Sequence, residues 1–211
     1  MRKSMRRTLL LFLCAGTFVS CEGVFTTSLV EWAQRDPSQL NRAQKINFAQ
    51  EALASGDRDS MKKAYDALKD TSDPSLQPLA AELAVGAAGV KDALSTVLGK
   101  VAAGSSKDEI KNALQEAFKS FSASDLALIM EASALLASAE SGGGTITADQ
   151  YFITGVGLLV VALNDAGGDV NQIDTTTGAG QLAINFLTKA KDQFAPDSEA
   201  AKLLNDFSGY F

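Results

Sequence analysis

Apolar side chains recur at three- and four-residue spacing along most of the chain beyond residue 38. This spacing is the period of an α-helix with one buried face, so we predict a helical protein. Residues that cap or end helices separate the apolar stripes. The predicted helices cover residues 28–36, 38–55, 57–72, 79–103, 106–121, 125–140, 147–163, 181–194 and 197–207, and residues 165–180 are predicted to form a loop with one helical turn near 170–173.

Two of these segments have the composition of interior helices. Residues 79–103 are rich in alanine and glycine, whose small side chains let helix axes approach closely, and a bend is predicted at Gly86–Gly89. Residues 151–163 have no charge, but this run is shorter than the roughly 20 apolar residues that span a bilayer. We interpret it as the core helix. A buried strand, which Ile153 and Val160-Val161 would favour, is the alternative.

The whole pattern predicts an all-α domain of eight or nine helices, whose antiparallel pairs pack as a compact bundle or a short α-solenoid. From Leu40 to Pro74 the chain has a helix, a Gly56-Asp57 turn, a second helix and a proline. This layout resembles one degenerate tetratricopeptide repeat, with Phe48-Ala49 at the motif's Leu-Gly position. The motif's Trp is absent, Met61 stands at its second-helix Ala position, and no 34-residue echo follows. The resemblance implies a concave surface that binds proteins.

The first 21 residues follow another pattern. Four basic residues precede an uncharged, mostly apolar run from Thr8 to Val19, which has the length of a signal-peptide core and is too short to span a bilayer. The run leads into Phe18-Val19-Ser20-Cys21, which resembles the lipobox of bacterial lipoproteins. The usual lipobox has Leu or another aliphatic residue where this chain has Phe18. In that family the cysteine thiol receives a diacylglyceryl group, the peptide is cut before the cysteine, and the new amino terminus is usually acylated.

The resemblance implies a division of the chain into a signal peptide (1–20), a lipidated Cys21 with a tether and a short helix (21–36), and a single helical domain (37–211). The lipid on Cys21 would attach the protein to the bacterial cell envelope. Glu22 follows the cysteine in place of the Asp that favours inner-membrane retention, so the outer membrane is favoured. The alternative is an N-terminal helix with an incidental cysteine. Trp32 lies near the anchor, but we expect it to pack in the first helix pair.

Charge restricts the possible partners. Four of the 19 Lys and Arg residues precede Cys21 and all 25 Asp and Glu residues follow it, so the chain from Cys21 onward has a net charge of −10. Such a surface repels phosphate backbones and anionic headgroups, and we therefore expect no nucleic-acid partner and no polybasic contact with the membrane. Attachment to the membrane would then depend on the acyl chains.

Composition also excludes several kinds of chemistry. The chain has no histidine, and its only cysteines are Cys14, within the predicted signal peptide, and Cys21, the predicted lipid site. Ser-His-Asp and Cys-His catalysis, the common zinc sites and haem ligation by histidine are therefore excluded. No thiol remains for a disulfide in the mature domain. We expect no enzyme, no catalytic residue and no cofactor.

Three clusters suggest a chemical role, and each has a simpler interpretation. The acidic loop from Asp165 to Asp174 could offer oxygens to calcium but lacks the Gly and Glu of an EF-hand loop. Gly155-Val156-Gly157 and Gly142–Gly144 lack the rest of a phosphate-binding motif and are interpreted as helix packing and a hinge. Carboxylates in first turns, such as Asp57 and Asp59, complement the helix dipole. Cys21 remains the only predicted site residue, and no metal site is predicted.

These expectations combine into a functional hypothesis. We expect a cell-envelope lipoprotein that acts as a non-enzymatic helical scaffold and binds a protein partner at the membrane. The alternative is a helical lipoprotein that binds a lipid or small molecule and serves a transport system. A partner site predicts a wide exposed groove with scattered apolar residues, whereas a ligand pocket predicts a closed cavity lined by Phe and Leu.

Overall fold

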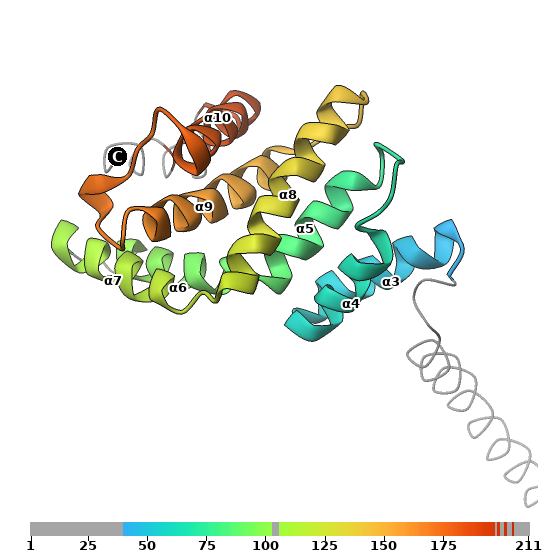
Figure 1. The fold of residues 1–211 in the computed structure, drawn as a ribbon, viewed down its shortest axis with the longest axis horizontal. Helices are drawn as coiled ribbons and strands as arrows, with labels where there is room; N and C mark the ends of the chain where they lie inside the picture. Colours follow the sequence, from blue (N-terminus) through green and yellow to red (C-terminus); the bar gives the residue numbers. More distant parts are fainter. Residues whose placement is uncertain (1–39, 103–105, 197, 199–200, 202–203, 205–211) are drawn as a thin grey trace, which may run out of the picture. The chain divides into compact units, whose positions relative to one another are not determined.

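The computed structural model describes residues 40–102, 106–196, 198, 201 and 204 of the chain (Figure 1). These residues form eight α-helices and one short 3-10 helix, and they contain no β-strand. The all-α prediction is therefore confirmed. Residues 151–163 form a helix, as predicted, and not the alternative strand. The elements are α3 (Arg42–Ser55), α4 (Arg58–Leu68), α5 (Gln77–Ala87), α6 (Val90–Ala102), α7 (Lys107–Lys119), α8 (Ala123–Ser141), α9 (Ala148–Asp165), η2 (Val170–Gln172) and α10 (Gly178–Gln193).

Several predictions fall outside the described residues. They are the signal peptide with Cys21, the tether and first helix with Trp32, and most of the helix predicted over 197–207. The tetratricopeptide resemblance also stays a prediction. Helices α3 and α4 pack on each other across the Gly56-Asp57 turn, but a packed pair is common to many helical folds.

Most helices begin where a side chain satisfies the free N–H groups of the first turn. The Asp57 carboxylate accepts a hydrogen bond from the backbone N–H of Ser60 at 2.8 Å and so begins α4. Ser106, Ser122 and Thr147 each form a reciprocal capping box with the residue three positions later, at the starts of α7, α8 and α9. The starts predicted for the helices over residues 57–72, 106–121 and 147–163 are therefore confirmed to within one residue.

Several predicted boundaries differ from the structure. Helix α3 begins at Arg42 instead of residue 38, and α4 ends at Leu68 instead of residue 72. Two further differences have a visible cause. Residues 79–103, predicted as one bent helix, form α5 and α6, because Gly89 between them adopts a left-handed backbone with φ of 83°. Helix α10 begins at Gly178 instead of residue 181. The Asp174 carboxylate accepts hydrogen bonds from the Thr176 N–H at 2.8 Å and the Thr177 hydroxyl at 2.7 Å, which orders the turn that leads into α10.

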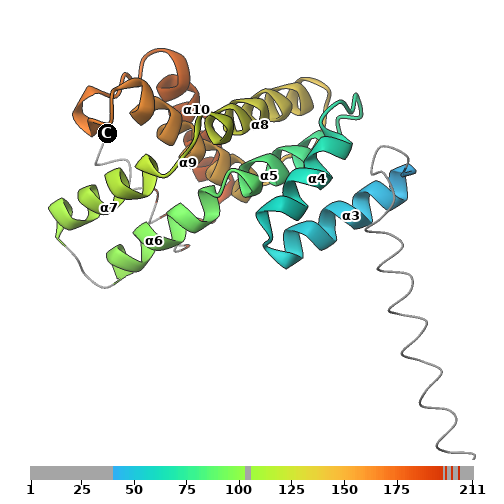
Figure 2. The same cartoon turned by 60° about the horizontal axis from the view of Figure 1, so that its bottom comes forward.

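The two central helices are α5 and α9. Every residue of α9 from Thr154 to Leu163 is buried, as are most residues of α5. The prediction of an interior helix is therefore confirmed for residues 151–163 and for the α5 part of residues 79–103. It is wrong for α6, most of whose described residues are exposed. Helix α8 packs on both, α10 packs on α9, and α4 packs on α5 (Figures 1 and 2). None of the helices within the described ranges has both the length and the apolar character that crossing a bilayer requires. Because α4 and α8 share α5 as a support, the space between them forms the candidate site.

Candidate functional site

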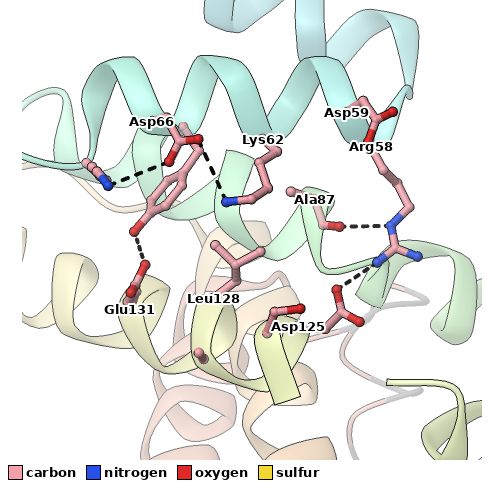
Figure 3. A pocket seen from close by; sticks show the side chains of 12 residues that line it. Arg58, Asp59, Lys62, Asp66, Ala87, Asp125, Leu128 and Glu131 are labelled. Atoms are coloured by element: carbon pink, nitrogen blue, oxygen red, sulfur yellow. Dashed lines mark hydrogen bonds and ion pairs between the residues drawn. The ribbon is translucent and has the colours of Figure 1, made fainter. Parts of the chain in front are cut away.

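A groove lies between α4 and α8. It contains two adjoining cavities of about 520 and 540 Å³, which share Tyr65, Lys69 and Glu131. One wall is the side of α4 from Arg58 to Lys69, and the other is the side of α8 from Ser124 to Ser138. We call this feature the α4–α8 groove. Figure 3 shows the first cavity, with side chains of α4 and α8 facing each other across it.

Arg58 connects three helices at one end of the groove. Its Nε donates a hydrogen bond to the Ala87 carbonyl oxygen at 2.8 Å, at the C-terminal end of α5 (Figure 3). Another guanidinium nitrogen pairs with the Asp125 carboxylate at 3.0 Å, in the first turn of α8. The guanidinium also lies over Gly89, where a Cβ would come within 2.8 Å of its Cζ. Arg58 therefore fixes how α4, α5 and α8 meet.

Tyr65 and Glu131 join α4 to α8 in the middle of the groove. The Tyr65 hydroxyl donates a hydrogen bond to Oε2 of Glu131 (Figure 3). Only 3% of Tyr65 is exposed. Burial, together with the hydrogen bond to the Glu131 carboxylate, raises the pKa of the Tyr65 hydroxyl above its ordinary value of 10.0. At neutral pH the proton therefore stays on Tyr65, and the tyrosine acts as a hydrogen-bond donor.

The groove as a whole has more carboxylates than cations to pair with them. Lys62 and Lys69 both approach Asp66, with nitrogen–oxygen distances of 3.8 and 3.7 Å. Asp59 and Asp70 have no cationic partner within the described residues. The residues that line the two cavities include three basic and five acidic side chains, which gives the groove a net charge of −2.

Gln77 lies at the other end of the groove. It is 7% exposed, and its Nε2 donates hydrogen bonds to the Ser138 hydroxyl at 3.0 Å and to the Thr71 carbonyl at 3.3 Å. Its Oε1 is buried and has no hydrogen-bond partner in the part of the chain that the structure describes. Because buried amide oxygens are normally paired, this wall of the second cavity lacks one donor.

The chemistry available in the groove is recognition of charged and polar groups. Its carboxylates accept hydrogen bonds and attract cations, and its lysines donate hydrogen bonds. Covalent catalysis requires a nucleophile beside a general base. Tyr65 does not supply that nucleophile, because its raised pKa keeps it protonated.

The clusters considered from the sequence have structural roles where they are described. In the acidic loop, Asp169 and Asp174 accept hydrogen bonds from residues of their own turns. No three acidic or cysteine side chains gather as metal ligands do among the residues that were placed. Gly155 lies in α9 against Leu187 of α10, and Gly157 lies against Ile129 of α8. The interpretation of this glycine pair as helix packing is therefore confirmed. Cys21, the predicted lipid site, is outside the described residues.

The groove was not predicted from the sequence. Tyr65 lies within the helix predicted over residues 57–72, and its partner Glu131 lies 66 residues further along the chain. One signal did point to this region. Between Asp125 and Glu140, Glu131 is the only charged residue, although a helix with a solvated face normally has several charges.

Comparisons with known proteins do not place this chain in a family. No protein-family model, curated protein or solved structure matches it. Function is therefore inferred from the groove and from the N-terminal sequence.

Proposed function

We propose that this protein is a lipid-anchored component of the bacterial cell envelope whose helical domain binds a protein partner in the α4–α8 groove. The anchor is Cys21, in keeping with the basic, apolar and Ser20-Cys21 pattern at the N-terminus. Glu22 after the cysteine favours the outer membrane. In this proposal the protein is a scaffold and not an enzyme.

The observation that supports a protein partner best is the lining of the groove. Asp59, Asp70 and Glu131 have no cationic partner within the described residues. They lie in α4, in the turn after it and in α8, and are therefore spread along the groove. A peptide segment can place several side chains along such a groove at once. Partner binding of this kind is the usual role of concave helical surfaces.

The alternative, a lipid or small-molecule carrier, has less support. An acyl chain requires a cavity lined by large apolar side chains. Leu128 and Leu135 are the only aliphatic residues larger than alanine among the residues that line these two cavities. Most of the other lining residues have charged or polar side chains.

The test of a protein partner is photo-crosslinking in the native cells. A photo-crosslinking residue is placed at Ser138 on the groove wall, and a matched one at Asn185, an exposed site on α10. The proposal expects one defined protein adduct from Ser138 and none from Asn185. Equal adducts from both positions, or none from Ser138, would contradict it. A bound lipid in native mass spectra without any adduct would favour the carrier.

The anchor is tested separately by mass spectrometry of the N-terminal peptide. The expected product begins at Cys21 and has acyl groups on it. The Cys21→Ser variant should leave the membrane fraction and lose the Ser138 adduct. An intact, unmodified Met1 to Cys21 segment in membrane-bound protein would show that the proposed anchor is wrong.

A further inference from the structure

The outward face of α8 is apolar although it is exposed. Ala127, Met130, Ala134 and Ala137 lie along this face at helical spacing, and all four are exposed. Ala127 and Ala134 also line the α4–α8 groove, so the face is continuous with it. Met130, at 39%, is one of two large hydrophobic residues with this degree of exposure in the described chain, the other being Leu182 at 36%. We call these four residues the α8 outer face.

This composition is unusual for a helix on a protein surface. Helices with one solvated face normally place Lys, Glu or Arg there, and helices that are apolar on all sides are normally covered. The opposite side of α8 is buried against α5 and α9 through Leu128, Ile129 and Leu136. Because alanine side chains are short, a second helix could approach the α8 outer face at the lower end of the usual 8–10 Å separation.

Both ends of α8 are fixed by charged contacts, and the α8 outer face lies between them. Asp125 pairs with Arg58 at the first end. At the other end Glu140 pairs with Lys189 of α10 at 2.6 Å, and the Lys189 ammonium lies 5.5 Å from the centre of the Tyr151 ring. The presented helix is therefore held in place before a partner arrives, which lowers the entropic cost of binding.

The charges beside this face indicate what kind of helix would cover it. The adjoining α4–α8 groove has a net charge of −2, and Glu131, Asp59 and Asp70 have no cationic partner within the described ranges. The wall of the second cavity also includes the Gln77 side chain, whose buried Oε1 lacks a donor there. A second copy of the chain would bring another net charge of −10 from its mature part, so like charges disfavour self-association.

We infer that the α8 outer face and the α4–α8 groove together bind a basic amphipathic helix of a protein partner. Small apolar residues of that helix pack on Ala127, Met130 and Ala134. Its Lys or Arg side chains enter the groove and pair with Glu131, with Asp59 of α4 and with Asp70 in the turn after α4. This inference rests on the proposed function and specifies the chemistry of the partner. Unlike that proposal, it can be tested with purified protein, without the lipid anchor and outside the cell.

The test uses a synthetic peptide of about 20 residues, which as a helix matches the roughly 28 Å length of α8. One face of the peptide contains Ala and Leu, and Lys residues flank that face. Its fluorescence anisotropy is measured with the full chain in the Cys21→Ser form. A second peptide, with every Lys replaced by Glu, is the charge control. The expected result is saturable binding of the basic peptide, weakened by salt, and no binding of the acidic one.

Two variants locate the binding surface. Met130→Glu and Ala134→Gln should each weaken binding by about tenfold or more, as changes at the centre of an interface do. Leu182→Glu is the matched control, because it changes an equally exposed apolar residue on α10 and adds the same charge. Met130→Glu makes the protein more acidic, so general attraction of the basic peptide would rise and not fall. Circular dichroism confirms that each variant is folded.

The outcomes separate the two proposals. Equal binding to Met130→Glu, Ala134→Gln and the unchanged protein would overturn the inference, as would binding of both peptides alike. A dimer in sedimentation that Met130→Glu dissociates would show that a second copy covers the face instead. A Ser138 adduct in cells, together with no binding of the basic peptide, would support the proposed scaffold function. It would refute only the inference that the partner presents a basic helix.

Discussion

The substitution Gly155→Ala tests how closely α9 and α10 pack. A Cβ at this position would lie 2.9 Å from both Cγ and Cδ2 of Leu187 and 3.3 Å from its backbone nitrogen. Contacts under 3.0 Å essentially never occur for real Cβ atoms. Because a branch carbon and the backbone are involved, a rotation of the Leu187 side chain cannot relieve both contacts. The two helices would have to separate.

Two opposing terms set the magnitude. Replacing Gly by Ala inside a helix stabilises it by about 0.8–1 kcal/mol. Inserting a methyl group into a packed core costs about 1–3 kcal/mol. The close approach of Leu187 places the cost in the upper half of that range, so Gly155→Ala should lower the free energy of unfolding by about 1–2 kcal/mol. At Gly99 in α6 a Cβ meets no atom within 4 Å, so Gly99→Ala should raise the free energy of unfolding by about 0.8–1 kcal/mol.

The assay is unfolding by urea and by heat, followed by far-ultraviolet circular dichroism. For a domain of this size about 1 kcal/mol shifts the melting temperature by about 2–4 °C. Gly155→Ala should therefore melt about 2–8 °C below the unchanged protein, and Gly99→Ala about 2–4 °C above it. The reasoning is refuted if Gly155→Ala is as stable as the unchanged protein while Gly99→Ala behaves as expected.

Three further predictions follow from single side chains. Since the pKa of Tyr65 is raised when the protein is folded, its contribution to stability is complete below pH 10.0 and is lost as the pH rises above that value. In urea unfolding, Tyr65→Phe should therefore lose less free energy of unfolding at alkaline pH than the unchanged protein; an equal loss would contradict the raised pKa of Tyr65. Hydrogen bonds from Thr176 and Thr177 lower the pKa of Asp174 from 3.8 to about 2. The contribution of Asp174 to stability is therefore present above pH 3.8 and is lost as the pH falls toward about 2. An NMR titration of the Asp174 carboxyl with a midpoint near 3.8 would refute the lowered pKa. Arg58→Ala removes the hydrogen bond to Ala87 and the pair with Asp125, and should lower the free energy of unfolding by about 1–2 kcal/mol, discounted for solvent exposure. Arg58→Lys should recover only part of the lost stability, because one ammonium group cannot contact both the Ala87 carbonyl and the Asp125 carboxylate as the guanidinium does. Full recovery would argue against this double contact of Arg58.

The order of the helices could be predicted from the sequence because the signals are local. Asp57, Ser106 and Thr147 cap helices by bonding to backbone groups three residues away, and no other part of the chain is needed for that. The same holds for Gly56, whose left-handed conformation ends α3. Boundaries that depend on packing were predicted less well. Helix α10 starts at Gly178 against local propensity, because the Asp174 turn orders the chain before it and because Ala179 and Gly180 are buried in its first turn.

The candidate site could not be predicted in the same way. Tyr65 and Glu131 are 66 residues apart, and nothing in the sequence indicates that they meet. Helical spacing places Lys62 and Asp66 on one side of α4, but it does not say that this side faces α8. The contact forms because α4 and α8 both pack on α5, whose small side chains allow both to approach.

By itself, the sequence determined the helical class, most helix boundaries, the acidic charge and the lipobox-like N-terminus, because each of these depends on neighbouring residues or on composition. The sequence also indicated a bend at Gly86–Gly89, where α5 and α6 separate. The tertiary structure alone decided which carboxylates remain without cations, and that Ala127, Met130 and Ala134 are exposed. Those properties depend on which distant segments share a surface. A run of apolar residues in a sequence predicts burial, and only the packed helices show which part of it stays uncovered.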